Sequence, residues 1–235
     1  MENLKQTKDI AFLMDSEELQ DATMKRRSFL KYTGASAAGL ALLAAGCKKD
    51  RNDDMGIRLG EGDIGILNYA YALEQLEAAF YTRVAATPNT GLSSAEAALF
   101  VDIRDHEIAH REFFKAALGN KAIGNLEVDF SSINFTNRDS ILSAAKAFED
   151  LGVSAYNGAG RLIQSADYLL LAGKIVSVEA RHAALIRDLI SNGTFADTTV
   201  VNTNGLDLSR SPGQVLAIAK AYIKTEISLT GLPNY

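Results

Sequence analysis

The chain has 235 residues, of which 47% are hydrophobic and 23% charged, and its formal net charge at pH 7 is −5. These values suit one globular domain with a full hydrophobic core, and the acidic balance argues against nucleic acid as a partner. The single cysteine excludes a disulfide framework and a thiolate site for zinc or an iron–sulfur cluster. Any transition metal must therefore be bound by oxygen and nitrogen atoms.

Residues 1–46 are interpreted as an export signal. A basic cluster precedes an apolar run of about 15 residues, Tyr32 to Gly46, which is shorter than a membrane span. The pair Arg26 and Arg27, followed by Ser-Phe-Leu-Lys, resembles a twin-arginine signal, which directs folded proteins across a membrane. The alternative is a basic cluster beside a chance apolar stretch. Met1 and Met24 both fit as the first residue ahead of this signal.

The only cysteine lies where the apolar run ends. The segment Leu43-Ala-Ala-Gly-Cys47 resembles a bacterial lipobox, which predicts cleavage before Cys47 and acylation of its sulfur. Ala44 departs from the pattern, where Leu or Val is commoner, and the alternative is a buried or free cysteine. Residues 47–60 follow as a charged, solvated tether. We therefore expect an exported domain that acyl chains anchor to a membrane of the cell envelope.

Apolar residues at helical spacing predict four long helices and a shorter fifth. A capping box, Ser93-Ser-Ala-Glu96, begins the second helix. Gly158-Ala-Gly160 breaks or kinks the third, and Ser211-Pro212 supplies the cap and first residue of the fifth. A long, partly extended connection over 120–137 lets the third helix begin away from the end of the second. The helices are expected at about 63–86, 93–118, 138–158, 165–191 and 211–226.

This order of elements predicts an all-α fold. Residues 61–192 form a four-helix bundle with a long crossover between helices 2 and 3. Residues 193–235 form a polar loop and an additional C-terminal helix. Only three prolines interrupt the chain, which leaves room for long helices.

One pattern occurs twice along these helices. Each copy reads Glu-x-Leu-x4-Tyr and is followed, after 33 residues (74 to 107) or 30 residues (149 to 179), by Glu-x-x-His. Residues three or seven positions apart lie on one face of a helix, so each copy presents its polar side chains together. The eight residues are Glu74, Tyr81, Glu107 and His110 in the first copy and Glu149, Tyr156, Glu179 and His182 in the second.

The faces that carry these glutamates are otherwise apolar. An ionised carboxylate on such a face costs several kcal/mol unless it is paired or ligated. Four carboxylates close together would raise one another's pKa or bind cations, and two divalent ions would balance their charge. We therefore predict a two-metal site, against the alternative of a scaffold that keeps the pattern without metal. The predicted ligands are Glu74, Glu107, His110, Glu149, Glu179 and His182.

Four further residues are expected beside these ligands. Glu77 lies one turn after Glu74 and could replace it, but the second copy has Gly152 at the matching position, so we assign Glu74 as the ligand and Glu77 as an outer carboxylate. His106 is expected at the surface or beside the site, with the rim of the site as an alternative. Tyr81 and Tyr156 are expected to hydrogen-bond ligand carboxylates, and a redox role is the alternative.

The segments Leu73-Glu-Gln-Leu-Glu-Ala-Ala-Phe-Tyr81, Phe148-Glu-Asp-Leu-Gly-Val-Ser-Ala-Tyr156 and Val178-Glu-Ala-Arg-His182 resemble the ferritin-like superfamily. More narrowly, they resemble bacterial exported ferritin-like proteins related to plant desiccation-related proteins. The resemblance covers roughly residues 60–192. It implies a di-iron or di-manganese centre bound by the six residues named above, in a superfamily of ferroxidases, peroxidases, manganese catalases and oxygenases.

Three functions follow from this reading. The first is a two-metal oxidoreductase that acts on O2 or peroxide, in which Glu107 and Glu179 bridge two iron or manganese ions. The second is a non-catalytic, stress-related envelope lipoprotein with a structural or vestigial metal site. Iron storage in a cage ranks lowest, because a lipid-anchored protomer fits poorly into a closed shell. The sequence leaves the metal, the substrate and the oligomeric state open.

Overall fold

The computed structural model describes residues 56–235. The predicted export signal with Arg26 and Arg27, the lipidation residue Cys47 and most of the tether lie outside these residues. At the end of the tether, Ile57–Arg58 forms strand β1 and Leu59 is buried. The folded domain therefore includes a few residues before position 61.

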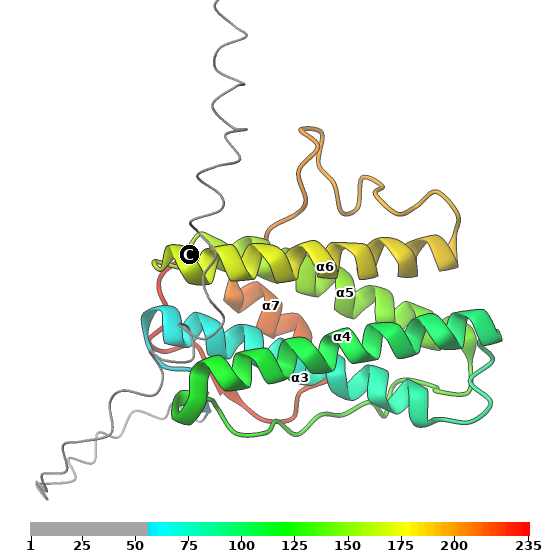
Figure 1. The fold of residues 1–235 in the computed structure, drawn as a ribbon, viewed down its shortest axis with the longest axis horizontal. Coiled ribbons are helices and arrows are strands. Elements are labelled where there is room, and N and C mark those ends of the chain that lie inside the picture. Colours follow the sequence, from blue (N-terminus) through cyan, green and yellow to red (C-terminus); the bar gives the residue numbers. More distant parts are fainter. Residues whose placement is uncertain (1–55) are drawn as a thin grey trace, which may run out of the picture. The chain divides into compact units, whose positions relative to one another are not determined.

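Four long helices build the domain, as the sequence predicts (Figure 1). α3 packs along α4, and α5 packs along α6, so the bundle consists of two helical hairpins. α7 packs against α5. The all-α fold is confirmed. The helices span Gly62–Ala86 (α3), Ser94–Leu118 (α4), Arg138–Gly160 (α5), Ala166–Ile190 (α6) and Pro212–Ala219 (α7), with a 3-10 turn, η2, at Gly119–Lys121.

Side-chain caps lie at the start of α4, α5, α6 and α7. Ser93 and Glu96 form the predicted capping box of α4, with both reciprocal hydrogen bonds present. Asn137 caps α5, and Ser165 caps α6. Ser211 caps α7 ahead of a proline in its first turn. Each cap satisfies an amide that the helix itself leaves unpaired.

The crossover between α4 and α5 runs along the outside of the bundle (Figure 1). Its middle is extended and pairs with the C-terminal segment: the amide of Asp129 donates to Tyr222, and that of Lys224 donates to Glu127. Further along the chain, β2 (Ile227–Ser228) pairs in parallel with β1, with Ile57 opposite Ile227. The C-terminal segment therefore joins the crossover to the start of the domain.

One predicted helix end agrees with the structure and one is wrong. The third long helix ends within Gly158-Ala-Gly160, as predicted, since α5 extends to Gly160. The backbone of Arg210 crosses α5 here, its amide donating to the carbonyl of Ser154 at 3.0 Å, and a Cβ on Gly158 would collide with the Arg210 carbonyl. The last helix ends at Ala219 rather than near 226, because the following residues turn to pair with the crossover.

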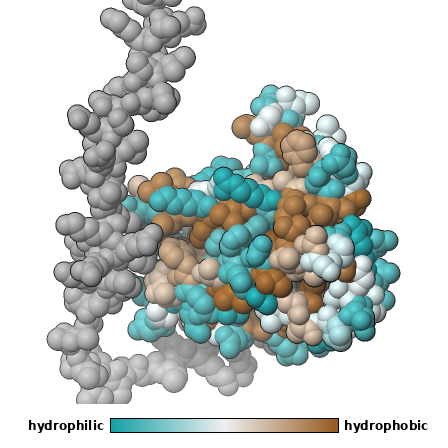
Figure 2. Space-filling view, turned by 45° about the vertical axis from the view of Figure 1, so that its right-hand side comes forward, coloured by the Kyte–Doolittle hydropathy of each residue, from teal (hydrophilic) through white to brown (hydrophobic). Residues whose placement is uncertain are grey.

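The core lies between the hairpins and under the crossover. α3 is buried along most of its length and is the central helix of the domain. Phe80 makes edge-on contacts with Phe130 of the crossover and Phe148 of α5, and Tyr222 packs edge-on against Phe148. The outer surface is mixed, with apolar patches between polar side chains over the face drawn in Figure 2. None of the helices within residues 56–235 has both the length and the apolar character that crossing a membrane requires.

Candidate metal centre

The four long helices bring the six predicted ligands together inside the bundle. They form two overlapping groups in which one donor atom from each residue lies within 4.8 Å of the others. Glu107 of α4 and Glu179 of α6 belong to both groups, so these two residues would help to hold both ions of a two-metal centre. The first group adds Glu74 and His110, and the second adds Glu149 and His182.

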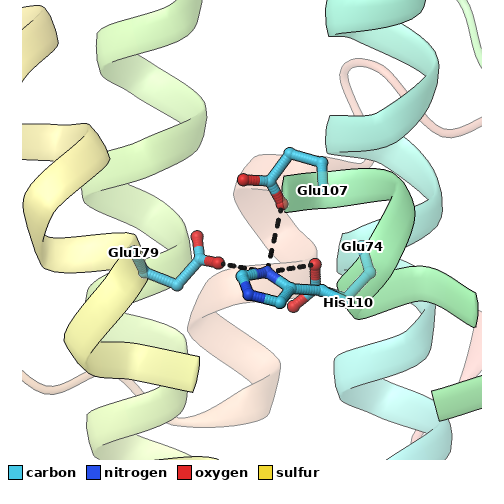
Figure 3. Close-up of side chains that lie close together, drawn as sticks. All are labelled: Glu74, Glu107, His110 and Glu179. Carbon is cyan, nitrogen blue, oxygen red and sulfur yellow. Dashed lines mark ion pairs between the residues drawn. The ribbon is translucent and has the colours of Figure 1, made fainter. Parts of the chain in front are cut away.

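The Nδ1 atoms of both imidazoles point toward the carboxylates. In the first group, His110 Nδ1 lies 2.9 Å from Glu179 Oε1, 3.5 Å from Glu74 Oε2 and 3.6 Å from Glu107 Oε2. Figure 3 shows these three carboxylates on three sides of the ring. In the second group, His182 Nδ1 lies 2.8 Å from Glu107 Oε1 and 3.6 Å from Glu149 Oε2. Each group thus presents three carboxylate oxygens and one ring nitrogen.

These donor atoms are buried and are not aligned to satisfy one another. All four glutamates have 0% of their surface exposed. Both Nδ1 atoms and at least one oxygen of each glutamate have no hydrogen-bond partner. Leaving so many buried polar atoms unpaired costs about 1–3 kcal/mol each. Cations between the groups would remove this cost, so the residues fit a metal centre.

Each tyrosine of the repeat reaches the glutamate of the opposite copy. The hydroxyl of Tyr81 donates to Glu149 Oε1, and the hydroxyl of Tyr156 donates to Glu74 Oε1. In both glutamates the other oxygen, Oε2, is left without a partner. The tyrosines therefore fix one oxygen of each outer carboxylate and leave the second free to bind a cation.

Burial shifts the pKa of every glutamate in the cluster. Burial raises the pKa of Glu74 to about 7, and burial raises the pKa of Glu149 above its usual range and that of Glu179 well above it. For Glu107, burial alone would raise the pKa, but the facing imidazoles of His110 and His182 hold it at about 2. A cation that binds here must therefore displace protons from some of these carboxylates.

The pKa values of both imidazoles in the cluster are raised. Burial alone would lower the pKa of each ring, but the surrounding carboxylates raise the pKa of His110 to about 12 and that of His182 to about 10. Without a cation, the two rings are therefore protonated at neutral pH. A metal ligand must be a neutral imidazole, so metal binding also releases these protons.

His106 lies against His182 at the edge of the cluster. Its side chain is exposed, its ring is parallel to that of His182 within 8°, and the ring centroids are 5.1 Å apart. Its Nδ1 lies 2.9 Å from His182 Nε2, so the nitrogen of His182 that faces away from the carboxylates has a hydrogen-bond partner. This contact orients the ring and leaves Nδ1 for a cation.

Glu77, which is expected as an outer carboxylate, is buried beside the cluster and does not belong to either group of converging donor atoms. It is 3% exposed, its Oε2 has no partner, and burial with the charge of Glu179 raises its pKa well above the usual range. The sequence reasoning missed that Gly152 leaves room for Glu77, since a Cβ at position 152 would lie 3.0 Å from Glu77 Oε1. The signal was present, since the comparison of the two copies aligned Glu77 with Gly152.

The family comparison agrees with this arrangement of helices. A family model described as a ferritin-like domain matches residues 62–192. The chain belongs to the ferritin-like family. The matched segment of this ferritin-like domain runs from the first residue of α3 to just beyond the end of α6, and it contains all six residues of the candidate centre. No curated protein matches the chain.

Proposed function

We propose that this ferritin-like domain binds two iron or manganese ions and carries out redox chemistry on O2 or peroxide. The observation that carries the proposal is the buried set of four carboxylates and two imidazoles whose facing atoms have no hydrogen-bond partners. Oxygen and nitrogen donors in this ratio suit iron and manganese. Such ions, when bound, supply the electrons that O2 or peroxide accepts.

The shape of the site favours a small substrate. The glutamates are fully buried, and the His182 and His110 side chains keep only 5% and 12% of their surface exposed. The exposed His106 stacks on His182 and covers part of that ring. A site this enclosed favours a small oxidant such as O2 or peroxide over a larger organic substrate.

The surrounding residues hold the ligands in place and control protons. Tyr81 and Tyr156 restrain the outer glutamates, so the ligand geometry is set before a cation binds. The apolar core on the crossover side excludes bulk water from the cluster. His106 links His182 Nε2 to the solvent and offers a route by which protons released on metal binding reach water.

The test starts from metal-free protein that is loaded with Fe²⁺ or Mn²⁺ without oxygen. Elemental analysis should give two ions per chain, and mixing with O2 or peroxide should consume the oxidant and change the absorption spectrum. Glu179→Gln should abolish both results, whereas Glu112→Gln, an exposed residue of α4, should change neither. Two bound ions without oxidant consumption would support the non-catalytic, stress-related alternative, and failure to bind any ion would refute the metal site.

We further propose that the domain is exported and held on a membrane by acyl chains on Cys47. The support is the sequence alone: the Arg26–Arg27 pair, the short apolar run and the position of the single cysteine at its end. Fractionation of cells that express the full chain tests this. The wild type should sediment with membranes, Cys47→Ser should not, and a membrane-bound Cys47→Ser protein would exclude the lipid anchor.

A further inference from the structure

The candidate centre contains five buried carboxylates rather than four. Glu77 lies three residues after Glu74 on α3 and therefore on the same face of that helix. It is 3% exposed, and the neighbouring charges are those of Glu179, Glu107, Glu149 and Glu74. Its Oε2 atom has no hydrogen-bond partner. The tyrosines that restrain Glu74 and Glu149 make no hydrogen bond to this carboxylate.

Gly152 makes the space that this fifth carboxylate occupies. A Cβ atom at Gly152 would lie 3.0 Å from Glu77 Oε1, which is closer than side chains normally pack, and 3.4 Å from Glu179 Oε2. Gly152 belongs to α5 and lies one turn after Glu149. The carboxylate of Glu77 therefore extends from α3 across the bundle to α5. The second copy of the repeat has no matching carboxylate, because the position equivalent to Glu77 is Gly152 itself.

The two oxygens of Glu179 indicate which half of the centre Glu77 faces. Glu179 Oε1 lies 2.9 Å from His110 Nδ1 and so belongs to the first group. Glu179 Oε2 is the oxygen nearer to Gly152, at 3.4 Å from a Cβ placed there, and Gly152 lies one turn after Glu149 of the second group. Glu77 is consequently adjacent to the second group, which contains Glu149 and His182.

We propose that Glu77 is a seventh protein ligand, which binds the cation held by Glu107, Glu149, Glu179 and His182 and makes the two metal positions unequal. This inference rests on the proposed metal site. Glu77 is not among the residues whose donor atoms already converge, so its carboxylate must swing toward the second group, for which its flexible side chain and unpartnered Oε2 are suited. The added negative charge favours a tightly bound cation at this position and a weaker one at the other.

The experiment is a titration of the metal-free protein with Mn²⁺, in which electron paramagnetic resonance counts the free ion. The wild type should bind two ions with different affinities. Glu77→Gln should weaken the tighter site at least tenfold and change the weaker site little. Glu77→Asp keeps the charge but shortens the side chain, and it should weaken the same site, which a purely long-range effect of charge would not do.

Two further variants control for folding and for charge. Gly152→Ala keeps Glu77 but pushes its carboxylate away, so it should weaken the tighter site by less than Glu77→Gln does. Glu112→Gln removes one negative charge from the exposed part of α4 and should leave both affinities unchanged. Metal-free Glu77→Gln should unfold at a temperature no lower than the wild type, because a neutral amide replaces a buried carboxylate without a partner.

The outcomes separate this inference from the proposed function. If the wild type binds no Mn²⁺, the metal site itself is wrong. If the wild type binds two ions and both Glu77→Gln and Glu77→Asp bind them with wild-type affinities, Glu77 is not a ligand and the proposed function stands. A loss of affinity in Glu77→Gln alone, with Glu77→Asp unchanged, would also overturn the ligand role and leave Glu77 as a source of charge.

Discussion

Raising the pH of the metal-free protein from 5 to 8 is expected to lower its stability. Glu74 shows the reason most directly, because burial raises its pKa from 4.5 to about 7 in the folded state. The unfolded chain releases this proton first, so the contribution is fully present below pH 4.5 and is lost as the pH rises to about 7. The difference in pKa corresponds to roughly 3 kcal/mol at most from this one group.

The other groups of the cluster do not oppose this trend between pH 5 and 8. The pKa of Glu149 and of Glu179 is raised by burial, so their contributions also decline as the pH rises. The raised pKa of His110 gives a contribution that is complete below pH 6.5 and declines only above it. The lowered pKa of Glu107 gives a contribution that is complete above pH 4.5 and is lost only toward pH 2.

Urea denaturation in the presence of a chelator at pH 5, 6, 7 and 8 measures the effect. The free energy of unfolding should fall across the series. In Glu74→Gln the fall should be smaller by about the contribution that Glu74 makes to it. In metal-loaded protein the trend should reverse, because metal binding requires deprotonated ligands and weakens as the pH falls. A free energy of unfolding that stays constant or increases with pH in chelator would refute the assignment of these carboxylates as buried groups whose pKa values are raised.

Three further predictions follow from the site and the fold. Chelation at pH 7.5 should lower the melting temperature of metal-loaded protein by about 10–20 °C, since two sites saturated at 100 times Kd contribute about 5 kcal/mol; an unchanged melting temperature would contradict the metal site. Tyr81→Phe and Tyr156→Phe each remove the hydrogen-bond donor to a buried carboxylate. Each should lower the free energy of unfolding of the metal-free protein, measured by urea denaturation, by about 1–3 kcal/mol. An unchanged free energy of unfolding would mean that these hydroxyls do not stabilise the carboxylates. Gly158→Ala should lower the free energy of unfolding by about 3 kcal/mol or more, because the backbone of Arg210 must move. Gly160→Ala should lower it much less, because the new Cβ meets only a leucine methyl at 3.7 Å. Similar losses of stability in both variants would mean that the crossing of Arg210 over α5 is not responsible.

The spacing of the repeat was sufficient to predict which residues converge. Three-residue and seven-residue spacings place side chains on one helical face whatever the rest of the fold does, so Glu107 with His110 and Glu179 with His182 had to act as pairs. The apolar neighbours of Glu74 then required that this face be buried. The caps at Ser93 and Ser211 could also be predicted from the sequence, because capping is a local interaction of side chain and backbone.

Features that depend on distant segments could not be predicted in this way. The glycines at 158 and 160 correctly predicted the end of α5, but the sequence did not show that Gly158 also accommodates the backbone of Arg210, a residue far along the chain. The last helix ends earlier than predicted because Lys224 pairs with Glu127 of the crossover. There a tertiary contact outweighs local propensity.

The sequence by itself determined the all-α class, the four long helices and the set of six potential ligands, since all of these follow from local periodicity. Only the tertiary structure decided how the two copies meet: which histidine nitrogen faces the carboxylates, which tyrosine restrains which glutamate, and how His106 stacks on His182. It also placed Glu77 against Gly152 of the neighbouring helix α5. These contacts join residues on different helices, and their geometry is set by how the helices pack rather than by spacing along any one of them.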